Sequence, residues 1–296
     1  ATMGQLQKAR QIILPYWRSR KLEAADEQRI LGEFAAILTQ ADHRRRMERM
    51  LYAERIASAD RIAKLADAEP LAKAWAAVIR NEKKAGDLLK AVPSEMRSAG
   101  YLFAEARYLR RKEKFVEAAE VMLNAPTARD ALIDPDAWWL ERRVLSRELL
   151  DIGDMKLAYR IAAAHAAESP VEAADAEFHA GWYALRGLND AKTGARHFAR
   201  ISEIASGPIS LSRAYYWLGR AREADGNDDA KSFYAKAATF GTTFYGQLAA
   251  ERIGDKTLNV AYPEPSVADR NRFERREGVR AIRFLERCGY QSLADM

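Results

Sequence analysis

Apolar residues recur along this chain at the spacing of an α-helix. Between Ile30 and Ala41 they occupy positions i, i+1, i+4, i+7, i+8 and i+11, which predicts one continuous apolar stripe on a helix. Asp26 precedes the stripe and is the expected N-cap. The next segment, from about Asp42, has apolar or small residues on more than one face, as a helix does when it lies between neighbours in a stack.

Prolines and glycines interrupt this pattern at short intervals, and the segments between them have the length of helices of roughly ten to fifteen residues. Val, Ile and Thr almost never alternate with polar residues, so a sheet architecture is disfavoured. The sequence therefore predicts an all-α protein. The segment 262–269, YPEPSVAD, is the expected extended connector, because each proline disfavours the α conformation in the residue before it.

Four segments look like copies of one helix hairpin. When the small residue after each turn is aligned, the copies lie 40, 37 and 35 residues apart, and the aligned residues are Ala118, Ala158, Ala195 and Ala230. This drifting period is close to the roughly 34 residues of tetratricopeptide repeats. Because one such hairpin cannot bury its own apolar face, neighbouring copies must stack. We expect an α-solenoid, or superhelix, of antiparallel helix hairpins with degenerate tetratricopeptide-like repeats.

The fourth copy is closest to the repeat consensus. Gly219 and Ala230 are expected to let two helix backbones approach, with Gly226 at the turn between them. Trp217 and Tyr234 are expected to fill the space between successive pairs.

Composition and charge narrow the class of protein only slightly. With 296 residues, 48% of them hydrophobic, the chain is long enough for a large core or an elongated solenoid. The net charge of +6 fits an anionic partner without naming one. The basic runs lie within helical patterns with acids nearby, so we interpret them as solvated helix faces and predict no nucleic-acid partner; they are Arg44–Arg46, Arg110–Lys112, Arg142–Arg143 and Arg275–Arg276.

The sequence shows no membrane span and no targeting segment. No apolar run approaches the roughly 18 residues of a transmembrane helix, and the first residues have no apolar h-region. A signal peptide that had been removed would leave no trace. The single cysteine, Cys288, has no partner for an internal disulfide and is expected to be a small buried hydrophobe near a helix end.

Catalytic and metal-binding motifs are scarce. The sequence contains no GxSxG, P-loop or GxGxxG pattern, and we predict neither a metal nor a cofactor. The histidines have no ligand spacing and are expected on helix surfaces or between helices; they are His43, His165, His179 and His197. The paired acids lie at turns, where we expect helix caps; they are Asp134/Asp136, Asp151/Asp154 and Asp225/Asp228/Asp229.

A pair of tryptophans is the best candidate for a binding surface. Trp138 continues into Leu145 and Leu149 at helical spacing, which indicates a core position. Trp139 lies about 100° further round the helix and is expected on an exposed face. Trp139, Arg142 and Arg143 are therefore the predicted substrate-binding residues.

The segment TTFYGQLAAERIG, residues 242–254, carries a family resemblance. It resembles the end of the superhelical region in soluble lytic murein transglycosylases, where an aromatic-Tyr-Gly-x-Leu-Ala-Ala pattern closes the array; the matching residues are Phe244, Tyr245, Gly246, Leu248, Ala249, Ala250 and Gly254. Residues 13–27, 134–154 and 209–221 are also similar to that family and follow its order. The signature residues, with Trp217 and Gly219, are expected to be mainly structural.

The resemblance implies a periplasmic protein that acts on peptidoglycan, with its signal peptide removed. Enzymes of this family cleave the β-1,4 bond between N-acetylmuramic acid and N-acetylglucosamine and leave a 1,6-anhydro end. Their catalytic glutamate lies in a C-terminal lysozyme-like domain, in a Glu-Ser followed by Gly-Leu-Met-Gln. Here Glu168-Ser169 precedes Pro170 and no Gly-Leu-Met-Gln occurs, so no residue inherits the catalytic role.

The resemblance thus predicts the non-catalytic superhelical region of such an enzyme, in a chain that stops before the catalytic domain. Its expected partners are peptidoglycan strands and its own catalytic domain. The predicted segments are an N-terminal superhelix at 1–100, tetratricopeptide-like repeats at 101–254, and a connector with a further helical segment at 255–296. The alternative is a tetratricopeptide-like scaffold that binds a protein partner and has no enzymatic role.

Overall fold

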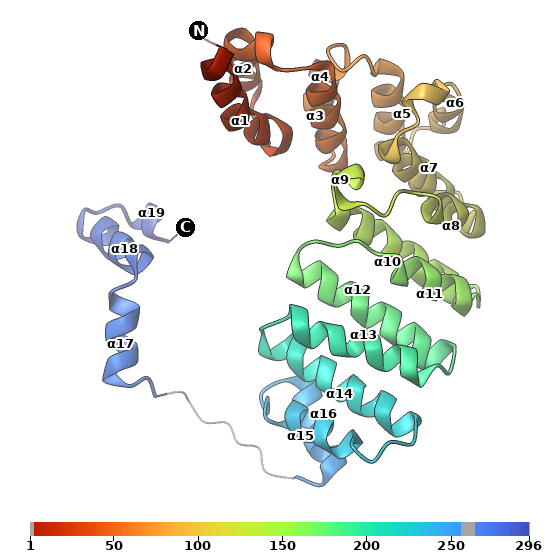
Figure 1. Cartoon of the computed structure of the whole chain (residues 1–296), viewed down its shortest axis with the longest axis vertical. Coiled ribbons are helices and arrows are strands. Elements are labelled where there is room, and N and C mark those ends of the chain that lie inside the picture. Colours follow the sequence, from red (N-terminus) through yellow and green to blue (C-terminus); the bar gives the residue numbers. More distant parts are fainter. Residues whose placement is uncertain (1–2, 256–263, 296) are drawn as a thin grey trace. The chain divides into compact units, whose positions relative to one another are not determined.

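The computed structural model describes residues 3–255 and 264–295, and within them it contains helices and turns but no strand (Figure 1). The predicted all-α, solenoid-like fold is therefore confirmed. The chain divides into two compact units, Ala1–Asp255 and Lys256–Met296. The first unit covers both of the predicted segments 1–100 and 101–254.

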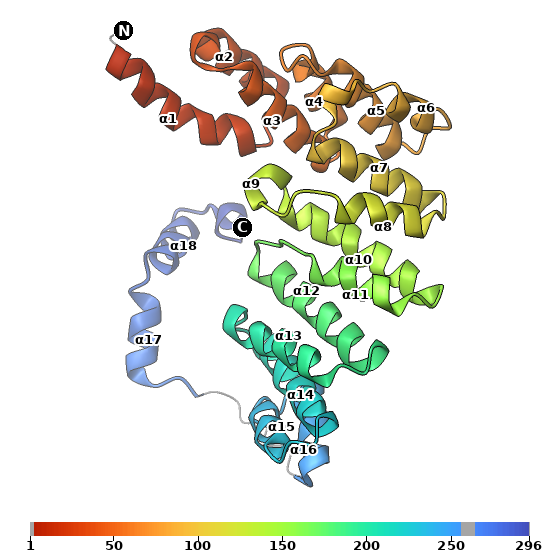
Figure 2. The ribbon, with the colours of Figure 1, turned by 45° about the vertical axis from the view of Figure 1, so that its right-hand side comes forward.

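The first unit is a series of helices that pack on their neighbours in chain order (Figure 2). It begins with α1 (Met3–Ser19), α2 (Ala24–Phe34), the 3₁₀ turn η1 (Ala35–Ile37), α3 (Gln40–Tyr52), α4 (Ile56–Ala63), α5 (Glu69–Ile79), α6 (Ala85–Lys90) and η2 (Ser94–Met96). It continues with α7 (Ala99–Arg111), α8 (Phe115–Leu123), α9 (Arg129–Leu132), α10 (Pro135–Asp151), α11 (Met155–Ala163), α12 (Pro170–Trp182), the π-helical turn η3 (Tyr183–Gly187), α13 (Ala191–Ile204), α14 (Pro208–Ala224), α15 (Ala230–Ala238) and α16 (Phe244–Ile253).

The apolar stripe between Ile30 and Ala41 does not lie on one helix, which corrects the prediction. Helix α2 ends at Phe34, and Thr39 starts α3 through a capping box in which its side chain and that of Asp42 bond each other's backbone N–H. This reciprocal cap satisfies two donors that a continuous helix would not leave free. Asp26 lies in the first turn of α2, whose N-cap is Glu23.

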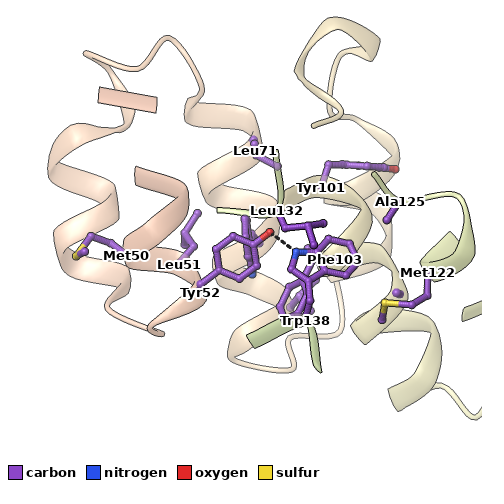
Figure 3. Packing of buried hydrophobic residues seen from close by; sticks show 14 of the residues in the cluster. Met50, Leu51, Tyr52, Leu71, Tyr101, Phe103, Met122, Ala125, Leu132 and Trp138 are labelled. Atoms are coloured by element: carbon purple, nitrogen blue, oxygen red, sulfur yellow. Dashed lines mark hydrogen bonds between the residues drawn. The ribbon is translucent and has the colours of Figure 1, made fainter. Parts of the chain in front are cut away.

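The core of the first unit includes a cluster of aromatic side chains from four helices. Figure 3 shows three of them, Tyr52, Phe103 and Trp138. The ring of Tyr52 lies 4.8 Å from that of Trp75 and 4.9 Å from that of Phe103, and Phe103 lies 5.3 Å from Trp138. The indole N–H of Trp138 donates to the hydroxyl of Tyr52 at 2.9 Å. Because these residues come from α3, α5, α7 and α10, the core is continuous from one helix pair to the next.

The repeat alignment is correct in three copies and shifted by one residue in the third. Ala118, Ala158 and Ala230 are buried near the start of the second helix of their pairs. In the third copy the buried small residue is Gly194, while Ala195 is half-buried. A Cβ on Gly194 would lie 3.0 Å from that of Leu185 and 3.1 Å from a backbone oxygen, so the closest helix approach falls there.

Several arginines of the predicted solvated faces instead join helices. Arg46 is fully buried and donates to the carbonyl of Trp17, in the last turn of α1, at 2.6 Å. Arg111 donates to the carbonyl of Val78, in the last turn of α5. The final carbonyls of a helix lack partners within it and carry partial negative charge, so they are favourable acceptors for a guanidinium. The prediction of solvated faces is wrong for these residues.

The second unit contains α17 (Val267–Glu274), α18 (Glu277–Arg287) and α19 (Gln291–Ala294), and none of its described residues is buried. Cys288 is exposed at the end of α18, so its predicted burial is wrong; this unit has no core to receive it. The extended connector is shorter than predicted, because α17 begins at Val267 behind a capping box made by Ser266 and Asp269. Tyr262 and Pro263 lie outside the described residues.

Candidate functional site

The two tryptophans of α10 are both buried. Trp138 is 1% exposed, which confirms the predicted core position, whereas Trp139 is 0% exposed, so the predicted exposed face is wrong. Helix α10 contacts α8, α11 and α12, and these neighbours leave no broad solvated face around Trp139. The indole N–H of Trp139 donates to the carboxylate of Asp175 at 3.2 Å, and the ring lies 5.5 Å from that of His179.

The two predicted arginines of α10 have different surroundings. Arg143 is half-buried and forms an ion pair with Asp175 at 3.2 Å, so it shares that carboxylate with Trp139. Arg142 is 3% exposed and donates to the carbonyl of Met122 at 2.9 Å and to that of Ile161 at 3.4 Å. Burial lowers the pKa of Arg142 to about 10. The three predicted residues therefore form an interhelical polar network rather than an open binding surface.

A buried carboxylate, Glu177 of α12, brings together side chains that the sequence analysis left apart. It lies 2.5 Å from the imidazole of His197, 3.3 Å from that of His165 and 3.2 Å from the guanidinium of Arg200. Burial raises the pKa of Glu177, but the hydrogen bonds and charges of the two histidines outweigh it and bring the pKa to about 2. The predicted interhelix position of His165 and His197 is confirmed, and their shared partner was missed.

The acids expected at helix starts do cap helices in two cases. Asp134 accepts from the N–H of Ala137 at the start of α10, and Asp154 accepts from that of Leu157 at the start of α11.

Asp136 has a different role, because its Oδ1 accepts from the backbone N–H groups of Glu168 and Ser169 at 2.8 and 3.1 Å. These two hydrogen bonds link the first turn of α10 to the start of α12.

The signature segment forms α16, and its glycine is required by packing. Thr243 caps this helix by accepting from the N–H of Gly246 at 3.0 Å and donating to the carbonyl of Phe240 at 2.8 Å. A Cβ on Gly246 would overlap that carbonyl oxygen and lie 2.7 Å from its carbon. Ala249 is fully buried in the same cluster as Tyr216. These contacts fit the mainly structural role expected of the signature residues.

The rest of the signature divides between core and surface. Gly219 lies against the ring of Tyr234, where a Cβ would come within 2.7 Å of a ring carbon. Trp217 is half-buried between Phe178 and Phe198, while Phe244 is 69% exposed. Packing therefore does not explain why the signature has an aromatic side chain at Phe244.

Two adjoining cavities form what we call the arginine groove. The first, of about 460 Å³, lies between α1, α3, the start of α10 and the segment before α12; its polar lining is Arg18, Ser19, Arg45, Arg49, Asp134, Asp136 and Glu168. The second, of about 400 Å³, shares Arg18, Arg45 and Ile133 with the first and adds Arg44, Glu48, Ser98 and Asp130. Both signs of charge therefore line a concave surface assembled from segments far apart in sequence.

Ile133 lines both cavities and has an unusual backbone conformation. Its φ of 64° lies in the left-handed region, which a β-branched residue rarely adopts. Such strain persists only where the surroundings enforce it, and it is common beside binding sites. Here it directs the chain from the short helix α9 into Asp134, the cap of α10.

Glu48 is the buried carboxyl of the groove. It is 2% exposed and accepts from Ser98 at 3.0 Å and from Arg44 at 3.2 Å. Burial raises its pKa more strongly than these partners lower it. A carboxyl whose pKa is raised by burial, at the edge of a cavity, marks the groove as a candidate functional site.

Two properties of the described residues bear on the kind of site. Among residues 3–255 and 264–295, no group of three or more His, Cys, Asp or Glu side chains is arranged to hold a metal ion. In the same described ranges, no helix has both the length and the apolar character needed to cross a membrane.

Comparisons with known proteins add no family assignment. The chain matches no family model, and no curated protein and no solved structure is significantly similar to it.

Proposed function

We propose that this chain is the non-catalytic superhelical region of a periplasmic lytic murein transglycosylase. In this role it positions peptidoglycan strands and offers a docking surface to a C-terminal lysozyme-like domain that cleaves them. The sequence itself holds no Glu-Ser followed by Gly-Leu-Met-Gln, so the cleavage chemistry belongs to that other domain.

The observation that carries the proposal is the segment FYGQLAA, folded as the capped helix α16. Its glycine lies against the carbonyl of Phe240, and its Ala249 packs into the last core cluster of the first unit. Gly254 then ends the helix in the left-handed conformation, with φ of 79°. A motif of this specificity, placed where the helical array ends, supports the same role as in the family that it resembles.

The arginine groove supports the strand-positioning part of the proposal. Peptidoglycan is anionic because its peptides carry carboxylates, and exposed guanidinium groups attract such polymers. Arg18, Arg45 and Arg49 line one concave surface and retain between 29 and 37% of their side-chain exposure. They are therefore accessible to a ligand that enters the groove.

The exposed apolar residues of the second unit support the docking part of the proposal. Phe273 and Phe284, on α17 and α18, and Tyr290, just before α19, are between 53 and 67% exposed. Soluble proteins seldom leave several aromatic side chains uncovered on so small a unit, and such surfaces are typical of contacts with another folded domain. We propose the lysozyme-like domain as the one that covers them.

Binding to purified sacculi tests the strand-positioning part. We expect this chain to pellet with sacculi at low salt and to be released at high salt, since the attraction depends on exposed charges. Absence of pelleting at low salt would contradict the proposal. A pull-down that instead yields one stoichiometric protein would favour the scaffold alternative.

The coding sequence beyond Met296 tests the docking part independently. We expect it to continue into a lysozyme-like domain that contains Glu-Ser followed by Gly-Leu-Met-Gln. A downstream domain of another kind would contradict the enzyme assignment, whatever the result with sacculi.

A further inference from the structure

The arginine groove holds one cation whose present partner is easily displaced. Arg45 donates to the carboxylate of Asp130 at 2.7 Å and to the backbone carbonyl of the same residue at 3.0 Å. The side chain of Asp130 is 92% exposed, and it belongs to the four-residue helix α9. An exposed ion pair contributes little stability, so a ligand carboxylate competes with Asp130 on favourable terms.

The other cations of the groove are held more firmly. Arg18 pairs with the fully buried carboxylate of Asp42, and Arg49 pairs with Asp134, the N-cap of α10. The carboxylates of Asp42 and Asp134 are far less exposed than that of Asp130, so a ligand displaces the partner of Arg45 more readily than the partner of Arg18 or Arg49.

The first cavity of the groove is also lined by acidic residues. Glu168 is exposed at the start of α12, and the carboxylate of Asp136 lies beside it, bonded to the Glu168 backbone N–H. An ammonium group is the natural partner for such a carboxylate. A ligand that pairs both with Arg45 and with these acids therefore carries carboxylate and ammonium groups together.

The lining also argues against other polymers. Among the described residues that line the two cavities, none is aromatic, so the groove offers no ring for a sugar to stack on. A uniform polyanion such as a nucleic acid would meet Glu168, Asp136 and Asp130 as well as the arginines. Neither a bare glycan nor a nucleic acid matches this arrangement of charges.

We infer that the arginine groove binds the peptide part of peptidoglycan, with a peptide carboxylate replacing Asp130 on Arg45 and a peptide amine facing Glu168. This inference rests on the proposed function, and it names the stem peptide rather than the glycan as what the groove recognises. Asp130 then acts as an occupant that holds Arg45 in place until a peptide arrives.

Calorimetric titration of the whole chain with stem peptides, released from sacculi by an amidase and purified, tests this inference. Loss of one charge-assisted contact predicts about tenfold weaker binding for Arg45→Gln and for Glu168→Gln. Asp130→Asn removes the competing carboxylate, so we expect binding several-fold tighter than in the unchanged protein. Arg160→Gln, at an exposed position of α11 outside the groove, is the matched control and is expected to bind as the unchanged protein does.

The gain expected for Asp130→Asn separates recognition from a loss of folding, because a damaged protein does not bind more tightly. Equal affinity in all variants, or no binding of the peptide, would overturn the inference. Pelleting with intact sacculi, in competition with free stem peptides or with soluble glycan strands freed of their peptides, separates the two proposals. If the protein pellets and the bare glycan strands release it while the stem peptides do not, the strand-positioning function stands and the peptide inference fails. If the protein does not pellet with intact sacculi, the proposed function fails, whatever the titration shows.

Discussion

The guanidinium of Arg142, buried in α10, donates a 2.9 Å hydrogen bond to the carbonyl of Met122 in the last turn of α8. It also reaches the carbonyl of Ile161 in the last turn of α11. These carbonyls end two neighbouring helices, where the partial charges of the helix dipole are negative. A buried cation with these partners needs no carboxylate, and it links three helices at one point.

Replacement of Arg142 tests this role in stability. Arg142→Met keeps most of the side-chain volume but leaves two buried carbonyls without a donor, so we expect a loss of about 1–3 kcal/mol in the free energy of unfolding. Urea denaturation followed by circular dichroism measures it. Arg160→Met, on the exposed face of α11, is the control and is expected to change stability by less than about 0.5 kcal/mol. Equal stability of the two variants would contradict the role assigned to Arg142.

The lowered pKa of Glu177 predicts how the free energy of unfolding changes in acid. Its pKa lies at about 2 in the folded protein, below the ordinary value of 4.5. A group whose pKa is lowered by folding stabilises the protein above the unfolded pKa and loses that contribution as the pH falls through the folded pKa. We therefore expect Glu177→Gln to be less stable than the unchanged protein above pH 4.5, with the difference shrinking towards pH 2.

Unfolding by urea at a series of pH values between 2 and 6 measures this difference. Glu203→Gln, at an exposed position of α13, is the control and should follow the unchanged protein across the range. Some acid sensitivity should remain in Glu177→Gln, because Asp42 also has a pKa of about 2. A constant gap between Glu177→Gln and the unchanged protein from pH 2 to pH 6 would rule out the proposed charge state.

The regular part of the fold was predictable because short-range rules determine it. Helical spacing placed Trp138 in the core, and the preference of Asp for helix starts correctly assigned caps to Asp134 and Asp154. Each of these depends on residues a few positions away, so one sequence is enough to reveal it.

The polar clusters were not predictable, because their members are distant in sequence and come from different elements. His165 and His197 lie 12 and 20 residues from Glu177, and no fixed spacing joins them. The prediction for Trp139 was wrong for a related reason. Helical spacing gives the direction of Trp139 around α10, but it does not show that α12 covers that side of the helix. The arginine groove is formed by five segments, which are residues 14–19, 41–49, Ser98, 130–136 and Glu168. The sequence pointed to several of these residues for other roles, but no local pattern brings the five segments together.

The packing around Gly246 predicts that adding one methyl group there lowers the stability of the protein. Its missing Cβ leaves room for the backbone carbonyl of Phe240, which cannot move without disturbing the Thr243 cap. We expect Gly246→Ala to lower stability by about 1–3 kcal/mol through overpacking. Gly32→Ala, in α2, meets nothing within 4 Å and should stabilise by up to about 1 kcal/mol through helix propensity. Thermal unfolding of the pair checks both signs, and a neutral Gly246→Ala would remove the packing explanation for the signature glycine.

Substitution of Trp139 distinguishes a structural role from the binding role that the sequence predicted. Trp139→Phe removes the bond to Asp175 and part of a fully buried ring, so we expect a loss of about 1–3 kcal/mol in the free energy of unfolding. Binding to sacculi should be unchanged, because the indole has no accessible face for a sugar. Leu140→Ala, at a position 42% exposed on the same helix, is the control and should change stability by less than about 0.5 kcal/mol. If Trp139→Phe binds sacculi more weakly while its stability is unchanged, Trp139 has the binding role and the structural role is contradicted.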